Sequence, residues 1–246
     1  MKNNKALGQH WLKNRTILDE IAELSGEGVL CVEIGPGLGF LTSSLLKRFD
    51  KVIAVEFDAE LAKKLPGSFP GKNLEVVNED ILKYDFLEVS QPYVIAGNIP
   101  YYITSPIIEK VLTLANLPER VVLLMQKEVA ERITSDKETL LSLFVKNRAK
   151  VWTGPVVSKV EFTPPPKVDS QVLVMEPLPK PVVKDEVFDL IKIGFSSPRK
   201  KLIHNLAKLK SKEELTEIFQ DLKIDVNARP EDLHLIDWND LYKKIK

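Results

Sequence analysis

Short apolar runs alternate with segments of helical periodicity over the first three quarters of the chain. Runs typical of buried strands lie at residues 29–34, 51–56, 74–78, 94–96, 121–125, 150–157 and 171–176. Apolar residues at helical spacing predict helices at residues 14–24, 58–65, 104–115, 127–133 and 140–146. A further helix is predicted after residue 39, with Leu41, Leu45, Leu46 and Phe49 on one face. Repeated strand–helix units predict an α/β fold with a parallel, doubly wound, Rossmann-like sheet.

The last quarter of the chain has a different pattern. Residues 177–181, Pro-Leu-Pro-Lys-Pro, have the composition of a linker, and helical patterns follow them to the end. Ser211 and Glu214 form a capping box that predicts a helix running to Leu222. We therefore predict two domains, residues 1–180 built on the sheet and residues 181–246 as a small all-helical domain.

Composition narrows the class of protein. The 246 residues are 44% hydrophobic, which supports a sizeable core, and contain no run of about 18 apolar residues that would span a membrane. The N-terminal residues lack an apolar signal segment, and the single cysteine, Cys31, lies in an apolar run where a buried thiol is expected. We expect a cytoplasmic monomer. Because the three histidines and the cysteine show no ligand spacing, we predict no metal.

Charge is balanced overall but segregated near the C-terminus. Lys+Arg and Asp+Glu each number 35. Residues 192–212 contain seven basic and no acidic residues, whereas residues 213–240 contain nine acidic and two basic residues. Such a basic stretch can contact phosphate, although a solvated helix face gives the same pattern. The candidates for phosphate contact are Arg199, Lys200, Lys201 and Lys208.

Polar and glycine-rich positions follow several of the predicted strands. Gly35, Gly37 and Gly39 come directly after one strand, and their spacing differs from the dinucleotide-binding fingerprint. Glu56 and Asp80 end the next two strands. Parallel sheets bind ligands beyond the carboxyl ends of their strands, so this order predicts a nucleotide-type pocket. Glu56 could accept hydrogen bonds from both ribose hydroxyls, and Asp80 could reach an adenine amino group or a neighbouring backbone N–H. Either acid could instead be a helix cap or a surface acid.

The tetrapeptide Asn98-Ile99-Pro100-Tyr101 follows the fourth apolar run. An Asn oxygen and a nearby carbonyl can accept two hydrogen bonds from a planar amino group, while a Tyr ring stacks on the base that carries it. This arrangement suits chemistry on the exocyclic nitrogen of adenine or cytosine. Asn and Pro are also ordinary turn residues, so the order of the preceding motifs carries the interpretation.

These motifs together resemble the class I S-adenosylmethionine-dependent methyltransferases. The chain is most similar to the rRNA adenine N6-dimethyltransferases of the KsgA/RsmA type, which act on the small subunit. The segments that carry the resemblance are Leu7 to Leu12, Val32 to Gly39, Val55 and Glu56, Glu79 and Asp80, Gly97 to Tyr101, Phe162 to Ser170, and Arg199 to Lys201.

The resemblance implies S-adenosyl-L-methionine as methyl donor and the rRNA of a pre-mature small subunit as partner. It implies that two adjacent adenosines in a 16S rRNA loop are each methylated twice, with a role in subunit biogenesis. Donor contacts would be made by His10, Leu12, Gly35, Gly37, Glu56, Asp80 and Asn98. The adenine N6 would be held by Asn98 and the Ile99–Pro100 backbone, with Tyr101 and Phe162 stacking on the base.

Two departures and three alternative functions remain. The family usually has Asn and Phe where this chain has His10 and Trp11, and Tyr-Gly where it has Glu138-Thr139. A large-subunit rRNA methyltransferase of the antibiotic-resistance type would share the pocket. A DNA amino-methyltransferase would share only the Asn-Pro-Tyr motif and its way of holding an amino group. A non-catalytic assembly factor would share the fold.

Overall fold

The computed structural model describes residues 9–89 and 91–246, which fall into two units. The first unit combines the described residues up to Glu131 with Lys150–Pro177, and the second combines Arg132–Ala149 with Leu178–Lys246. The boundary after Pro177 lies at the start of the expected linker. The second unit also includes residues 132–149, which the apolar pattern groups with the sheet. Leu7 and Gly8, in the first segment of the resemblance, lie outside the described residues.

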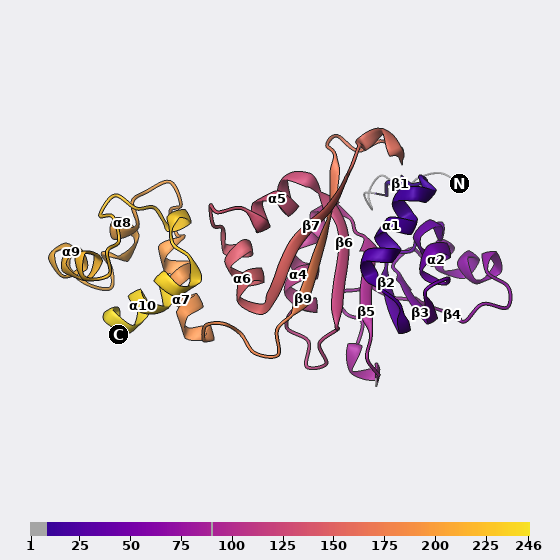
Figure 1. Ribbon diagram of the computed structural model, residues 1–246, viewed down its shortest axis with the longest axis horizontal. Helices are drawn as coiled ribbons and strands as arrows, with labels where there is room; N and C mark the ends of the chain where they lie inside the picture. The colour runs from indigo at the N-terminus through magenta and orange to yellow at the C-terminus, as the bar shows by residue number, and fades with distance from the viewer. Residues whose placement is uncertain (1–8, 90) are drawn as a thin grey trace. The chain divides into compact units, whose positions relative to one another are not determined.

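Nine strands are described, and seven of them form one sheet in the order β4-β3-β2-β5-β6-β9-β7 (Figure 1). The strands are β1 (Trp11–Leu12), β2 (Gly28–Ile34), β3 (Phe49–Glu56), β4 (Leu74–Asn78), β5 (Val94–Asn98), β6 (Arg120–Gln126), β7 (Ala149–Val157), β8 (Phe162–Thr163) and β9 (Ser170–Pro177).

The sheet is mostly parallel, as the strand–helix alternation predicts. Strands β4, β3, β2, β5 and β6 run parallel to one another, whereas β9 pairs antiparallel to β6. The expectation of parallel pairing was therefore wrong at β9. Strand β9 lies between β6 and β7 in the sheet. The chain from β7 to β9 holds a 3₁₀ turn and β8 rather than the crossover helix that parallel neighbours need.

Helices of the first unit pack on this sheet, and α1 lies against α2 and over β5 and β6. Asn14 caps α1 by accepting a hydrogen bond from the Ile17 N–H, and the helix ends at Gly26, as the sequence predicted. The helices are α1 (Arg15–Ser25), α2 (Phe40–Leu45), α3 (Ala59–Lys64), α4 (Thr104–Val111) and α5 (Lys127–Thr134), which crosses the unit boundary. Two expectations were wrong: α4 ends at Val111 instead of residue 115, and Phe49 begins β3 instead of extending α2.

The second unit is helical and has its own apolar core, centred on the fully buried Trp238. Leu143 of α6 packs in this core, which explains why residues 132–149 belong here. Ser211 and Glu214 form the predicted capping box. The helices are α6 (Leu140–Arg148), α7 (Asp185–Gly194), α8 (Leu202–Leu206), α9 (Lys212–Asp221) and α10 (Leu235–Ile245).

The Glu138-Thr139 departure has a structural role within the second unit. Glu138 is 3% exposed, and its carboxylate accepts hydrogen bonds from Ser142 Oγ at 2.6 Å and Lys146 Nζ at 2.9 Å. The ring nitrogen Nδ1 of His234, just before α10, lies 3.1 Å from the same carboxylate. Thr139 caps α6. These residues therefore tie the 132–149 segment to the C-terminal helices.

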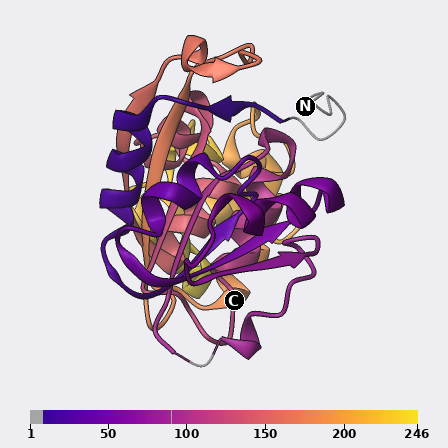
Figure 2. The ribbon, with the colours of Figure 1, turned by 90° about the vertical axis from the view of Figure 1, so that its right-hand side faces the viewer.

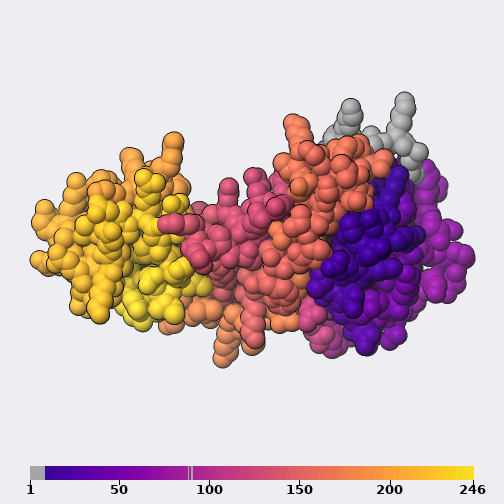
Figure 3. All heavy atoms as spheres, turned by 45° about the horizontal axis from the view of Figure 1, so that its top comes forward, coloured from indigo at the N-terminus to yellow at the C-terminus, as the bar shows by residue number. Residues whose placement is uncertain are grey.

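A separate two-stranded sheet positions the N-terminal segment in the first unit. Strand β1 pairs antiparallel to β8, with Trp11 opposite Thr163 and Leu12 opposite Phe162. In Figure 2 the indigo strand near the N-terminus lies beside the salmon segment around residue 160, and in Figure 3 atoms of the two colours are adjacent. The pairing brings the start of the described chain to the loop after β8, although His10 and Pro164 are 154 residues apart in sequence.

Candidate active site

A cavity of about 240 Å³ lies at the carboxyl ends of the parallel strands of the first unit. It is lined by the N-terminal segment, the glycine-rich loop after β2, the ends of β3 and β5, and the turn after β4. The cavity brings together most of the sequence-predicted residues: His10, Leu12, Gly35, Gly37, Glu56, Asp80, Asn98, Ile99, Pro100 and Tyr101.

The glycine-rich loop approaches the cavity with its backbone. Gly35 and Gly37 have φ angles of 63° and 58°, in the left-handed region that favours glycine. A Cβ built on Gly37 would lie 3.3 Å from the Trp11 Nε1 atom, so Trp11 packs directly on this loop. A Cβ on Gly35 would meet no described atom within 4 Å, and it faces open space that a ligand can fill.

Glu56 is fixed at the end of β3 by two backbone donors. Its Oε2 accepts from the Gly37 N–H at 2.9 Å, and its Oε1 accepts from the Asp58 N–H at 2.8 Å. Burial raises the pKa of the Glu56 carboxyl, and these backbone hydrogen bonds counteract the shift. A carboxylate has about four lone-pair sites, so the group can still accept hydrogen bonds from hydroxyls in the cavity.

A second acid, Glu33, lines the cavity and was missed as a site residue by the sequence analysis. It is 1% exposed, and its Oε2 accepts a hydrogen bond from Thr42 Oγ1 at 2.6 Å. Burial raises the pKa of this carboxyl to about 8. A glutamate inside the apolar run 29–34 was the signal that could have identified it.

Asp80 lies in the turn that follows β4. Its Oδ1 accepts a hydrogen bond from the Leu82 N–H at 2.9 Å. Lys110 of α4 supports the same turn, since its Nζ donates to the carbonyl oxygens of Leu82 at 2.9 Å and Tyr84 at 2.8 Å. Burial lowers the pKa of Lys110, while the nearby Glu79 and Asp80 oppose that shift. The turn is therefore held in a defined position beside the cavity.

Asn98 and Tyr101 border the cavity from the end of β5 and from the 3₁₀ turn that follows it. The Nδ2 of Asn98 donates to the main-chain oxygen of His10 at 2.9 Å. The hydroxyl of Tyr101 lies 2.7 Å from Ser170 Oγ, and burial raises the pKa of the tyrosine. Both side chains are thus oriented by residues distant in sequence.

Phe162 lies elsewhere. It is 3% exposed and packs in an apolar cluster with Leu12 and Leu18, in β8 opposite Leu12. It is not among the described residues that line the cavity. The predicted stacking residues are therefore brought together only in part: Tyr101 borders the cavity, and Phe162 belongs to the core beside it.

Two exposed aromatic side chains line the cavity and were not predicted as site residues. Phe57 is 61% exposed and follows Glu56, and Tyr102 is 64% exposed and follows Tyr101. Exposed aromatic rings of this size offer stacking surfaces for planar ligands. Their position next to a predicted site residue was the available signal in each case.

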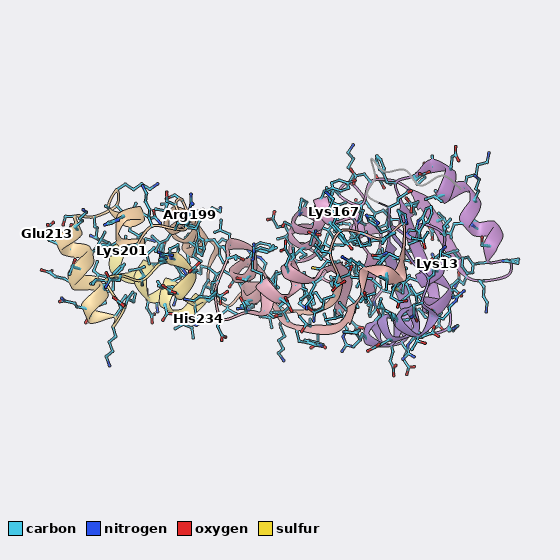
Figure 4. The ribbon with its side chains drawn as sticks, turned by 90° about the horizontal axis from the view of Figure 1, so that it is seen from above. Lys13, Lys167, Arg199, Lys201, Glu213 and His234 are labelled. Atoms are coloured by element: carbon cyan, nitrogen blue, oxygen red, sulfur yellow. The ribbon has the colours of Figure 1, made fainter. Side chains whose placement is uncertain are left out.

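The second unit places two of the four predicted RNA-contact residues on one hollow. Lys200 and Lys208 line it, together with Lys212, His204, Ser196 and Ser197. The described residues that line the hollow include no acid, and these three lysines make no ion pair within the described chain. Arg199 and Lys201, labelled in Figure 4, are outside the lining, and Lys201 Nζ donates to Asn227 Oδ1. The spacing of lysines from Lys200 to Lys212 was readable in the sequence.

The described residues also bear on metal binding and on membrane insertion. No group of three or more His, Cys, Asp or Glu side chains in residues 9–89 and 91–246 is arranged to hold a metal ion. None of the helices in the same ranges is both long and apolar enough to cross a membrane.

The sheet order, the glycine-rich loop and the strand-end acids define the fold class of the first unit as that of the class I methyltransferases. The chain belongs to the ribosomal RNA adenine dimethylase family, whose sequence profile matches residues 1–246.

Individual relatives agree with this assignment. Ribosomal RNA small subunit methyltransferase A of a Picosynechococcus species is 38% identical, over 97% of this chain and 95% of its own. The crystal structure of a dimethyladenosine transferase from Plasmodium falciparum is 30% identical, with a TM-score of 0.81, over 96% of this chain and 98% of its own. The 23S rRNA methyltransferase ErmE is 24% identical, with a TM-score of 0.80 over 96% of this chain and 99% of its own, and thus shares the fold.

Proposed function

We propose that this protein transfers methyl groups from S-adenosyl-L-methionine to the N6 atoms of two adjacent adenosines in a 16S rRNA loop. The observation that carries the proposal is the orientation of Asn98, which leaves its oxygen available beside a cavity built for a nucleoside-type ligand. Family membership and the name of the Picosynechococcus relative support rRNA of the small subunit as substrate.

The cavity residues fit the donor. Gly35 faces open space, and Glu56 keeps acceptor capacity for two ribose hydroxyls. Asp80, in its fixed turn, would accept from the amino group of the donor's adenine, and Phe57 would stack on that ring. When bound, the donor supplies a methyl group already activated on a sulfonium, so no metal is required.

Further donor contacts would come from the rest of the cavity lining. We assign them to Leu12, Gly37 and Asn98, and to the main chain of His10. The main chain is favoured for His10 because its side-chain Nδ1 is already bonded to the Pro164 carbonyl oxygen, at 2.7 Å. A main-chain contact would survive replacement of the His10 side chain.

Asn98 and its neighbours would act on adenine N6, the nitrogen that receives the methyl group. The lone pair of adenine N6 is delocalised into the ring, which makes it a poor nucleophile. The Asn98 oxygen and the Ile99–Pro100 backbone carbonyl would each accept an N6 hydrogen, favouring a tetrahedral nitrogen whose lone pair faces the methyl group. Orientation and preorganised acceptors then provide most of the rate, and the displaced proton leaves to water.

An adenine must leave its stack to reach this cavity, and aromatic contacts offset that cost. Tyr101, which is held by Ser170, provides the stacking ring that borders the cavity. A direct stacking role for Phe162 requires its ring to leave the core cluster that it occupies here. We therefore assign base stacking first to Tyr101 and keep Phe162 as a second contact to be tested.

Docking on rRNA would involve the second unit. We propose that at least two of Arg199, Lys200 and Lys201, together with Lys208, bind the RNA backbone. The hollow that Lys200 and Lys208 share with Lys212 supports this assignment. Its lysines are unpaired within the described chain, whereas other lysines of the same unit pair with acids: Lys210, Lys243 and Lys244. The enzyme would act as a cytoplasmic monomer on pre-mature small subunits.

The decisive experiment methylates purified small and large ribosomal subunits with labelled S-adenosylmethionine and identifies the products by mass spectrometry. We expect N6,N6-dimethyladenosine at two adjacent positions of 16S rRNA. Label in the large subunit would instead indicate an enzyme of the antibiotic-resistance type. Subunit binding without transfer would indicate an assembly factor, and either result would overturn the proposal.

A further inference from the structure

His10 joins three parts of the first unit that meet at the cavity. Its Nδ1 atom lies 2.7 Å from the carbonyl oxygen of Pro164, in the loop after β8. Its main-chain oxygen accepts the hydrogen bond from Asn98 at the end of β5. Its ring lies nearly parallel to that of Tyr101, with 6.1 Å between centroids and 18° between planes. One residue thus adjoins both side chains assigned to the target base.

The bond to Pro164 determines the tautomer of His10. A carbonyl oxygen only accepts hydrogen bonds, so Nδ1 carries the proton. In the neutral ring, Nε2 is then unprotonated and has no hydrogen to donate. The neutral imidazole therefore donates its single hydrogen bond to the protein's own backbone, at the Pro164 carbonyl oxygen.

The bond from Asn98 determines the orientation of the catalytic amide. A flipped amide would set Oδ1 against the main-chain oxygen of His10 and bring two acceptors together. The Asn98 oxygen must therefore be directed away from His10. Because the partner is a main-chain atom, the amide orientation depends on where residue 10 lies, and the bond to Pro164 anchors that residue.

We propose that His10 is a positioning residue for methyl transfer: its imidazole anchors the main-chain oxygen that orients Asn98 and supports the ring of Tyr101. This inference rests on the proposed function for its catalytic readout. It differs from a side-chain contact with the donor. Loss of a side chain that binds the donor weakens donor binding and turnover together, whereas loss of a positioning residue lowers turnover far more than donor binding.

Three substitutions separate the two interactions of the side chain. His10→Asn keeps an N–H near the place of Nδ1 and removes the ring, His10→Phe keeps a ring and removes the N–H, and His10→Ala removes both. Turnover on small subunits should fall between about tenfold and a hundredfold in His10→Ala, the range expected for a misplaced catalytic group. His10→Asn should recover most of that loss, and donor affinity measured by calorimetry should fall by much less than turnover in the folded variants, because most of the cavity lining is unchanged.

Nitrogen-15 NMR of labelled histidines gives a readout that does not depend on activity. The His10 resonance, assigned by its disappearance in His10→Asn, should show the Nδ1–H tautomer. An Nε2–H tautomer, or a loss of donor affinity that matches the loss of turnover in His10→Ala, would overturn the proposal. So would equal turnover in His10→Ala and the wild type. If the wild type methylates neither subunit, the proposed function fails, while the NMR result still decides the Pro164 bond.

Discussion

The carboxylate of Glu56 accepts a hydrogen bond from the backbone N–H of Gly37 at 2.9 Å, across 19 residues of sequence. The bond joins the end of β3 to the glycine-rich loop after β2, so these two elements of the cavity hold one another in place. The same carboxylate accepts from the Asp58 N–H on its other oxygen. A change at Glu56 should therefore affect both the ligand and the loop.

Glu56→Ala should weaken S-adenosylmethionine binding strongly. Each charge-assisted hydrogen bond that is removed costs about 1.5–3 kcal/mol, or roughly tenfold or more in affinity. Calorimetric titration measures the effect, and thermal unfolding checks that the variant is folded. Glu60→Ala, which removes an 81% exposed acid from nearby α3, is the matched control. Unchanged affinity in folded Glu56→Ala would remove Glu56 from the donor site.

Asn98→Ala should abolish N6 methylation while leaving RNA binding nearly intact. The amide acts on one amino group, whereas phosphate contacts dominate affinity for RNA. Turnover and subunit binding are measured on the same preparation. Asn73→Ala, at an exposed asparagine outside the cavity lining, is the control and should match the wild type in both. Near wild-type turnover in Asn98→Ala would contradict the acceptor mechanism.

The ring and the hydroxyl of Tyr101 can be tested separately by two substitutions. Tyr101→Ala removes the stacking surface, worth roughly 1–3 kcal/mol per base, and should impair turnover. Tyr101→Phe keeps the ring and gives up only the hydrogen bond with Ser170, so it should retain much more activity than Tyr101→Ala. An equal loss of activity in the two variants would mean that the hydroxyl, and not the ring, is required.

Phe162 requires a test that separates stability from stacking. Phe162→Ala should lower the free energy of unfolding by about 3–5 kcal/mol, because the ring is 3% exposed in the core. It should also impair turnover if the ring stacks on the base. Phe162→Leu preserves most of the core packing, so its turnover is the informative quantity. Turnover that follows stability alone would leave Phe162 a purely structural residue.

The strand-end site was predictable because it depends on local patterns. Glycines after an apolar run and acids at the ends of the next two runs place Gly35, Glu56 and Asp80 at one edge of a parallel sheet. The cap at Asn14 and the capping box at Ser211 are similarly local, because each is formed by residues a few positions apart.

The remaining features depend on interactions between distant residues. Strand β1 has two residues, too few to show a period, yet its pairing with β8 places His10 beside Asn98, 88 residues away. Phe162, to which the resemblance assigned stacking on the base, lies in the paired strand β8 and is buried. Residues 132–149 have an ordinary helical pattern, and their place in the second unit comes from the buried Glu138 and Leu143. The antiparallel direction of β9 likewise depends on the connection from β7, its neighbour in the sheet, which contains no crossover helix.

Glu33 should make stability depend on pH. Burial raises the pKa of its carboxyl from 4.5 to about 8, so the folded protein retains a proton that the unfolded chain releases between these values. The stabilisation is complete below pH 4.5 and is lost as the pH rises toward 8. Glu33→Gln should remove this dependence and gain stability relative to the wild type as the pH rises from 4.5 to 8.

Urea unfolding across that window measures the Glu33 effect. Glu27→Gln, at an exposed acid just before β2, is the matched control and should follow the wild type. Parallel stability curves for Glu33→Gln and the wild type would show that the carboxyl titrates normally in the folded protein.

The basic residues of the second unit should determine docking on rRNA. Charge reversal at Arg199 and Lys200 should weaken small-subunit binding and lower its salt slope by about one unit for each phosphate that is no longer neutralised. Because Lys200 and Lys208 line the same hollow, Lys200→Glu with Lys208→Glu should have at least as large an effect. Donor affinity should not change, since the cavity proposed for the donor belongs to the first unit.

Reversal of Lys243 and Lys244 is the matched control for Lys200 and Lys208. It changes the net charge of the second unit equally, but these lysines pair with Asp240 and Asp221 outside the hollow. If general electrostatic attraction drives binding, reversal of Lys243 and Lys244 should weaken subunit binding as much as reversal of Lys200 and Lys208. If the hollow binds phosphates locally, only reversal of Lys200 and Lys208 should lower the salt slope. Unchanged affinity and slope in both the Arg199/Lys200 and the Lys200/Lys208 variants would mean that the second unit is not an RNA-docking surface. The small-subunit substrate would then rest on family membership alone.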